Sequence, residues 1–302
     1  MLAIIAPGQG SQTPGMFNSW IADPSLKGLL VSWSDAIDLD LLHLGTVADA
    51  EEIKDTANAQ PLIVAASLLG AHALGIKNYA VTSGHSVGEL AAAAISGAIS
   101  ENDALTIVRA RGVEMAKAAA ASPAGMSAVL GGDRTEVLAT IAALKLVAAN
   151  DNGAGQIVAA GDLGALATLN ENPPAGARVR ALAVAGAFHT EFMQAAVEPL
   201  RALSSTVTTH PVSIQVISNK DGQVVTDGAE VLNRIVNQIA NPVRWDLCME
   251  TLKSLGVTGV IELPPAGTLV GLLKRTASEI ETFALKSADD LDAAREFAGR
   301  HT

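Results

Sequence analysis

The chain has 302 residues, of which 49% are hydrophobic and 17% charged, which is enough apolar material for one large domain or two unequal ones. Its formal net charge of −11 argues against nucleic acid or an anionic membrane as the main partner. Cys248 is the only cysteine, so no disulfide can form within the chain, and a reducing cytoplasm is the expected location. No window of about 18 apolar residues lacks polar interruption, so we expect no membrane span.

The N-terminal run LAIIA, residues 2–6, has the length and composition of a buried strand and leads into a glycine-rich turn that contains Gln9. The turn resembles the start of a dinucleotide-binding fingerprint, but Thr13 occupies the position of the required third glycine. A turn after a buried strand is a typical place for a site residue. The spacing alone favours an ordinary loop.

A strand is predicted over 79–82 and an alanine-rich helix from 88 to 99, with the sequence GHSVG between them. This pattern matches G-x-S-x-G, the nucleophile elbow, in which glycines relieve a crowded strand-to-helix turn. Such a turn presents the Ser86 hydroxyl at a helix N-terminus, where free N–H groups stabilise developing negative charge. The alternative is a glycine-punctuated turn whose serine only caps the helix.

The next predicted helix begins after Ser100, which precedes Asp103 in a capping-box-like pattern, and runs to about residue 120. Arg111 lies in the middle of its apolar face, whereas Arg109 points away from that face. A buried arginine needs a partner because an unpaired buried charge is very costly. Two partners stay open, a carboxylate of the protein such as Glu89 or a carboxylate of the substrate.

The segment 123–185 has a different texture and predicts the element order β-α-β-β-α-β of a ferredoxin-like unit. The predicted strands cover 125–130, 146–149, 156–160 and 178–184, and the predicted helices 134–144 and 163–170. We expect an α/β fold, with this small domain inserted in a large α/β domain made of 1–122 and 186–302. Asn150 and Asn152 lie in the turn between its central strands.

His189 precedes a predicted helix over 191–203 where the chain returns to the large domain. A lone histidine is usually structural, so its setting alone does not make it a catalytic base. Further buried strands are predicted over 212–219 and 259–263, with a helix over 231–239 between them. No cluster with metal-ligand spacing such as H-E-x-x-H occurs.

Taken together, eight ordered motifs resemble the malonyl-CoA:acyl carrier protein transacylases of fatty acid synthesis, and the resemblance covers nearly the whole chain. The motifs are PGQGSQ, GHSVGEL, RGVEM, GMSAVLG, ANDNGAGQIVAAG, AFHTEFM, QIANPVRW and PAGTLVGLLKR. The resemblance implies a large α/β-hydrolase-like domain with a parallel sheet core and a small inserted ferredoxin-like domain.

By this resemblance Ser86 is the nucleophile, His189 is its base, and Arg111 binds the malonyl carboxylate. The main-chain carbonyl of Gln238 orients His189 in place of a triad acid. Gln9, together with the N–H of Val87, serves the oxyanion hole.

The resemblance also implies substrate-binding or selectivity roles for His85, Phe188, Asn150 and Asn152. The chain departs from the family pattern in residues 264–267, PPAG, where a single proline between glycines is commoner. This change alters none of the implied catalytic residues, but it can affect how a nearby loop is held.

The implied reaction is ping-pong transfer of malonyl from malonyl-CoA to the phosphopantetheine thiol of acyl carrier protein, without a metal or bound redox cofactor. One alternative is an α/β-hydrolase esterase or thioesterase, which also uses G-x-S-x-G but expects a late catalytic histidine. The only late histidine is His301, in the tail. The other alternative is a non-catalytic carrier-protein-binding module, which would not need Ser86, His189 and Arg111 all intact.

Overall fold

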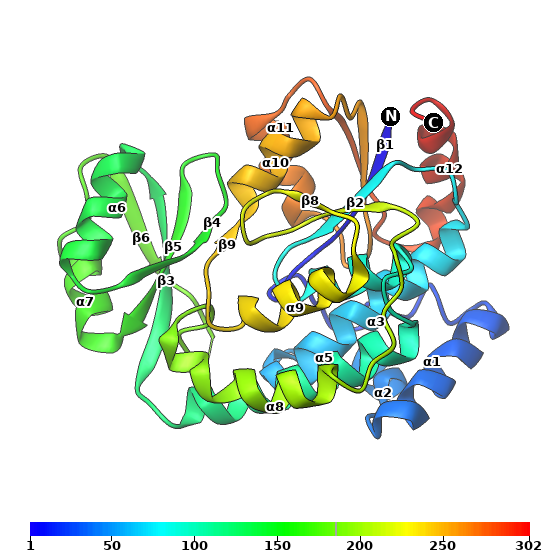
Figure 1. Ribbon diagram of the computed structural model, residues 1–302, viewed down its shortest axis with the longest axis horizontal. Helices are drawn as coiled ribbons and strands as arrows, with labels where there is room; N and C mark the ends of the chain where they lie inside the picture. Colours follow the sequence, from blue (N-terminus) through cyan, green and yellow to red (C-terminus); the bar gives the residue numbers. More distant parts are fainter. Residues whose placement is uncertain (185) are drawn as a thin grey trace.

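The computed structural model describes residues 1–184 and 186–302, which form two sheets flanked by helices (Figure 1). The larger sheet has six strands in the order β11-β10-β1-β2-β7-β8. Their bounds are Leu2–Ala6 for β1, Val81–Gly84 for β2, Gln215–Ile217 for β7, Val224–Val225 for β8, Gly259–Glu262 for β10 and Glu281–Ala284 for β11. All neighbours pair in parallel except β7 and β8. The prediction of an α/β fold with a parallel sheet core is therefore confirmed.

Strand β1 lies in the middle of this sheet, and all five of its residues are buried. Because side chains alternate along a strand, Ile4 and its same-face neighbours join one core cluster, while Ala3 and Ile5 join a second cluster on the opposite face. A strand covered on both faces needs no polar residue, which explains the continuous apolar run LAIIA.

Helices cover both faces of the large sheet. Side chains of α3, α4, α5 and α9 belong to the first cluster, and side chains of α10 and α11 to the second. The helices of this part of the chain are α1 (Pro24–Ile37), α2 (Leu41–Thr46), α3 (Thr56–Leu74), α4 (Gly88–Ile95), α5 (Glu101–Ala120), α8 (Gln194–Ser204), α9 (Gly228–Gln238), α10 (Trp245–Ser254), α11 (Thr268–Thr276) and α12 (Leu291–Gly299). Short 3₁₀ turns occupy Glu52–Lys54, Glu191–Met193 and Ala288–Asp290.

Helix α3 packs against α1, α2, α4, α5 and α12. It carries Pro61, which has no N–H and cannot bond to the Ala57 carbonyl one turn earlier. Arg109 of the adjacent α5 donates to that carbonyl at 2.9 Å, so the interrupted hydrogen bond is replaced from outside. Within the described residues α3 alone is long and apolar enough to cross a membrane by length and composition. In this structure 72% of that window is buried inside the fold, as in a core helix.

The second sheet has five strands in the order β6-β3-β5-β4-β9. Strands β3 (Ala124–Gly131), β4 (Val147–Asp151), β5 (Gln156–Asp162) and β6 (Ala177–Ala181) alternate with α6 (Arg134–Ala143) and α7 (Leu163–Glu171) in the ferredoxin-like order. Their mutual pairing is antiparallel. Figure 1 shows α6 and α7 on the side of this sheet that faces away from the rest of the molecule.

One strand of the second sheet comes from a distant part of the chain. Strand β9 (Val243–Arg244) pairs in parallel with β4, through Asn150 with Val243 and Asp151 with Arg244. The sequence predicted no strand there. The division into units of 1–122 with 186–302 and 123–185 stays a prediction, and its boundary at 185 lies outside the described residues.

Candidate active site

The turn between β2 and α4 has the geometry of a nucleophile elbow. Ser86 has φ of +53°, in the left-handed region that a side chain rarely adopts. A Cβ at Gly84 would lie 2.0 Å from the Gly88 carbonyl carbon, and one at Gly88 would lie 2.4 Å from the Ala6 oxygen. Both glycines are therefore required by backbone crowding, and the strained turn holds Ser86 at the N-terminus of α4.

Ser86 is hydrogen bonded to His189, more than one hundred residues later in the chain. The Ser86 Oγ and the His189 Nε2 are 2.7 Å apart, and the His189 Nδ1 is 2.8 Å from the main-chain oxygen of Gln238. A carbonyl oxygen only accepts, so Nδ1 carries the ring proton and Nε2 presents a lone pair to the serine hydroxyl. This tautomer can accept the Ser86 proton.

His189 is buried and held in position by its backbone. Its φ is +62°, and its N–H donates to the Ile239 carbonyl at 3.1 Å. Burial, together with the positive charge of Arg111, lowers the pKa of His189 to about 3. The ring is therefore neutral at physiological pH, as a general base must be.

Arg111 is only 1% exposed and points at the same serine. Its Nη2 lies 3.4 Å from the Ser86 Oγ and 3.2 Å from the Gln238 Oε1, and its Nη1 donates to the Gln60 Oε1 at 2.6 Å. All these partners are neutral. Within the described residues Arg111 forms no ion pair with a carboxylate, and its Nε has no hydrogen-bond partner. The direct pair with Glu89, one of the two partners left open by the sequence, does not form.

Behind the serine lies a buried network centred on Glu89 and Asn219. Glu89 accepts from the Asn219 N–H and from the Gln238 Nε2, both at 2.6 Å. Asn219 in turn accepts from the Ser86 N–H at 2.8 Å and donates to the Gly84 carbonyl at 2.8 Å. Burial raises the pKa of Glu89 to about 8, opposed by the Asn219 N–H and the charge of Arg111.

The two residues matched to an oxyanion hole lie beside the elbow. Gln9 follows β1, and its side chain is held by contacts of 3.2 Å to the Thr56 hydroxyl and 3.4 Å to the Gln60 amide. Val87 precedes the first residue of α4, and its N–H donates no hydrogen bond to another described residue. Free donors at a helix N-terminus suit an oxyanion.

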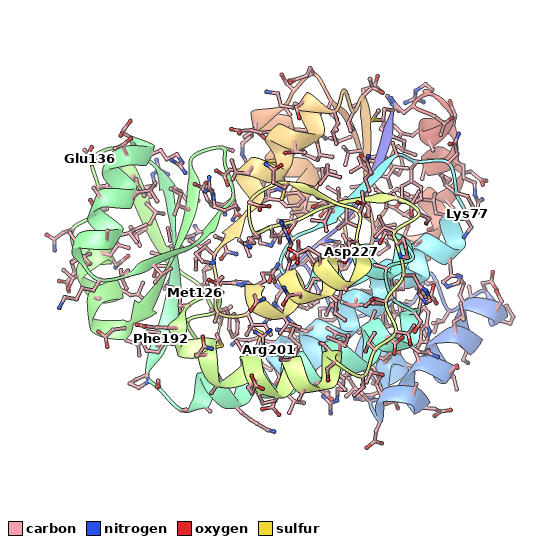
Figure 2. The ribbon with its side chains drawn as sticks, in the orientation of Figure 1. Lys77, Met126, Glu136, Phe192, Arg201 and Asp227 are labelled. Carbon is pink, nitrogen blue, oxygen red and sulfur yellow. The ribbon has the colours of Figure 1, made fainter. Side chains whose placement is uncertain are left out.

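The serine opens into a cleft of about 330 Å³ between the two sheets. It is lined by Gly8, Gln9, Gly10, Ser11, Gln60, His85, Ser86, Met115, Met126, Asn150, Asn152, Gln156, Val158, Leu182, Val184, Phe188, His189, Thr268, Leu269 and Leu272. Figure 2 labels Met126, on the side of the second sheet that faces the rest of the molecule. All predicted site residues except Val87, Arg111 and Gln238 thus line one cleft, and these three lie directly behind it.

His85 links the elbow to the second sheet. Its Nε2 lies 2.8 Å from the Asn152 Oδ1, and its ring packs edge-on against Trp245 with centroids 5.7 Å apart. Asn150, two residues before Asn152, pairs with Val243 of β9. The predicted pair of asparagines therefore faces the site from the second sheet.

Residues 264–267, where the chain departs from the family pattern, pack behind the cleft. Ser67 of α3 donates to the Pro264 carbonyl at 2.8 Å. Glu262, fully buried, accepts from the N–H groups of Gly267, Leu269 and Val270 and so caps the start of α11. Leu269 lines the cleft, so this cap holds one of its walls.

Sequence reasoning missed two residues of the site, Gln60 and Asn219. Gln60 is itself buried and directly precedes the apolar run PLIVAA of α3, an unusual position for an amide that could have drawn attention. Asn219 follows β7, at the carboxyl edge of the parallel sheet where functional side chains gather. Among residues 1–184 and 186–302, no group of three or more histidine, cysteine or acidic side chains is placed to hold a metal ion.

Comparison with known proteins agrees with this geometry. Residues 4–296 match the model of the acyl transferase domain family. A Malonyl CoA-acyl carrier protein transacylase of Mycobacterium tuberculosis is 52% identical over 297 residues, which cover 97% of this chain and 98% of that one.

Solved structures agree as well. The crystal structure of MCAT from Mycobacterium tuberculosis superposes with a TM-score of 0.95 at 52% identity, over 98% of this chain and 99% of that one. A malonyl-transacylase in complex with a type II PKS acyl-carrier protein has a TM-score of 0.91 at 28% identity, over 98% and 99% of the two chains. The chain belongs to the acyl transferase family, and within it to the malonyl-CoA:acyl carrier protein transacylases.

Proposed function

We propose that the protein transfers the malonyl group from malonyl-CoA to the phosphopantetheine thiol of acyl carrier protein through a malonyl-serine intermediate, supplying fatty acid synthesis in the cytoplasm. One observation carries the proposal. The Ser86 hydroxyl faces a neutral His189 at 2.7 Å and the guanidinium of Arg111 at 3.4 Å, and that guanidinium has no carboxylate partner among the described residues. The site thus combines an activated nucleophile with a buried cation available to an anionic acyl group.

In the first half-reaction the Ser86 Oγ attacks the thioester carbonyl while His189 Nε2 takes the hydroxyl proton. Gln9 and the backbone N–H of Val87 stabilise the tetrahedral oxyanion, and each donor contributes roughly 3–4 kcal/mol. The intermediate collapses with cleavage of the carbon–sulfur bond. CoA leaves as a thiol with the proton from His189, and a malonyl-serine ester remains.

In the second half-reaction the phosphopantetheine thiol of the carrier protein gives its proton to His189 and attacks the ester. The serine oxygen leaves and recovers the proton, so the enzyme returns to its starting state. The Gln238 carbonyl keeps the His189 ring in the required tautomer through both halves.

Arg111 binds the malonyl carboxylate in this scheme. Its unbonded Nε and its Nη2 offer adjacent donors, the arrangement that carboxylates accept in pairs. His85, Asn150 and Asn152 border the path of the thioester arm, and Phe188 crowds the acyl group next to His189. No step of the scheme uses a metal or a bound redox group.

The names of the relatives support the two substrates. The protein of Mycobacterium tuberculosis is named for malonyl-CoA and acyl carrier protein, and another solved relative is held in complex with an acyl-carrier protein. A thioesterase with the same elbow would release malonate, and a binding module would take up no acyl group.

The test is the intact mass of the protein after mixing with malonyl-CoA alone. We expect the addition of one malonyl group on the peptide that contains Ser86, and its loss when holo carrier protein is added. Release of free malonate without a stable ester would indicate a hydrolase. An unchanged mass would overturn the proposal.

A further inference from the structure

Glu89 is a buried carboxylate to which the proposed reaction gives no step. It is 2% exposed, its side chain makes no hydrogen bond to Ser86 or His189, and both its carboxylate oxygens are used within the protein. A buried carboxylate is expensive to maintain, so a residue of this kind calls for an explanation in terms of what it holds.

The first group that it holds is the side chain of Gln238. Above its raised pKa of about 8, Glu89 is ionised and only accepts hydrogen bonds, so in that state the Gln238 amide must turn its nitrogen to Glu89 and its oxygen to Arg111, as it does in the structure. The opposite rotation would point an N–H₂ group at the guanidinium, where two donors face each other. Arg111 would then lose one of the contacts that hold it 3.4 Å from the Ser86 Oγ.

The second group is Asn219. Glu89 accepts its backbone N–H, while the Asn219 Oδ1 accepts from the Ser86 N–H at 2.8 Å and from the Gln238 Nε2 at 3.1 Å. Glu89 therefore holds the side-chain amide of Gln238, which contacts Arg111, and the backbone N–H of Asn219, whose side chain contacts the Ser86 N–H.

We propose that Glu89 is a positioning residue for acyl selectivity: its oxygens set the direction of the Gln238 amide and so keep that amide's oxygen on Arg111. The inference rests on the proposed malonyl transfer. Arg111 contacts a malonyl group but not an acetyl group, so loss of the Glu89 carboxylate weakens acylation by malonyl-CoA more than acylation by acetyl-CoA.

The experiment measures kcat/KM for self-acylation by malonyl-CoA and acetyl-CoA at about pH 9, above the raised pKa of Glu89. The proteins are wild type, Glu89→Gln, Gln238→Met and the double variant. Met at 238 removes the amide and leaves the carbonyl that bonds to His189. We expect each single variant to lower the malonyl-to-acetyl ratio by about tenfold, as for one hydrogen bond to a charged group. The double variant should lower the ratio no further, because both changes act through the same amide.

Glu262→Gln is the matched control. Glu262 is also a buried carboxylate that accepts backbone N–H groups, but it caps α11 and does not contact Gln238 or Arg111. Glu262→Gln should lose stability like Glu89→Gln. Through the apolar Leu269 wall of the cleft it can change the acylation rate, but equally for malonyl-CoA and acetyl-CoA, so the wild-type ratio should be kept.

Three results would overturn the inference. They are an unchanged ratio in Glu89→Gln, additive effects in the double variant, and an equal fall of the ratio in Glu262→Gln. If Glu89→Gln does not fold, the inference is tested with Gln238→Met alone. A wild-type malonyl-to-acetyl ratio in Gln238→Met would overturn it, because the direction of the amide would then be irrelevant. A wild-type protein that takes up no malonyl group would overturn the proposed function and this inference with it.

Discussion

The two sheets meet the cleft with different kinds of side chain. From the six-stranded, mostly parallel sheet and its helices come the reactive and charged groups, among them Ser86 after β2 and Arg111 of α5. From the five-stranded sheet and the segment that follows β6 come only uncharged lining residues. They are Met126, Asn150, Asn152, Gln156, Val158, Leu182 and Val184. The proposed nucleophile therefore lies at the carboxyl edge of the larger sheet, while the second sheet lines the other side of the cleft. The following experiments test this division of labour.

The largest effect is expected for Ser86, the proposed nucleophile, which follows β2 of the larger sheet. Ser86→Ala should abolish acylation by malonyl-CoA, since no other hydroxyl lies at hydrogen-bond distance from His189 among the described residues. Intact mass and peptide mapping measure the acyl group. Label that persists in the variant, or that appears on another peptide, would contradict the assignment.

Arg111→Ala should follow, with a loss of roughly 2–4 kcal/mol in malonyl transfer, the value of a charged hydrogen bond and a buried pair together. This corresponds to roughly 30- to 1000-fold in kcat/KM. Acetyl transfer should change little, so the preference inverts, and Arg111→Lys should recover only part of the loss. An equal loss for malonyl-CoA and acetyl-CoA would make Arg111 purely structural.

The second sheet should contribute less, and without regard to acyl charge. Asn152→Ala removes one contact to the His85 ring, worth about 0.5–1.5 kcal/mol. We expect a loss of about 2- to 12-fold in kcat/KM that is equal for malonyl-CoA and acetyl-CoA. A selective loss of malonyl transfer would mean that the second sheet also recognises the carboxylate.

The smallest change is expected on acidification. Burial lowers the pKa of His189 to about 3, so the base stays neutral between about pH 5 and 7, where an ordinary histidine gains its proton. The acylation rate per folded molecule should be constant within about twofold over this range. The free energy of unfolding should fall as the pH falls through about 6.5, because the His189 ring binds a proton there in the unfolded chain but stays neutral in the folded protein. The acylation rate and the unfolding midpoint, measured at each pH, check the two predictions. A fall of the acylation rate per folded molecule near pH 6.5 would contradict the prediction that the base stays neutral.

Local pattern predicted much of this arrangement. The elbow, the buried face of α5 with Arg111, and the ferredoxin-like order all follow from spacing over fewer than about twenty residues at a time. The meeting of Ser86 with His189 came only from the resemblance, because it joins residues that are far apart in the chain. Neither the local pattern nor the resemblance identified Gln60 and Asn219, because an amide is recognised as part of a site only by the groups that surround it.

Strand β9 was missed for a related reason. Two residues, Val243 and Arg244, are too short to show any periodicity, and they become a strand only because the edge of β4 offers them hydrogen bonds. The partner of Arg111 was also left open by the sequence. In the structure Arg111 donates to the neutral amides of Gln60 and Gln238, whereas a protein carboxylate was one of the two expected partners.

The position of β1 has a consequence for how the protein is made. It is translated before the other strands of this sheet, yet in the sheet it lies between β2 and β10, and Leu2 aligns with Gly259. One edge of the nascent strand therefore stays unpaired until β10 has been translated. A prematurely terminated chain would expose that edge together with the apolar face meant for α10 and α11, so it should be a substrate for chaperones and proteases.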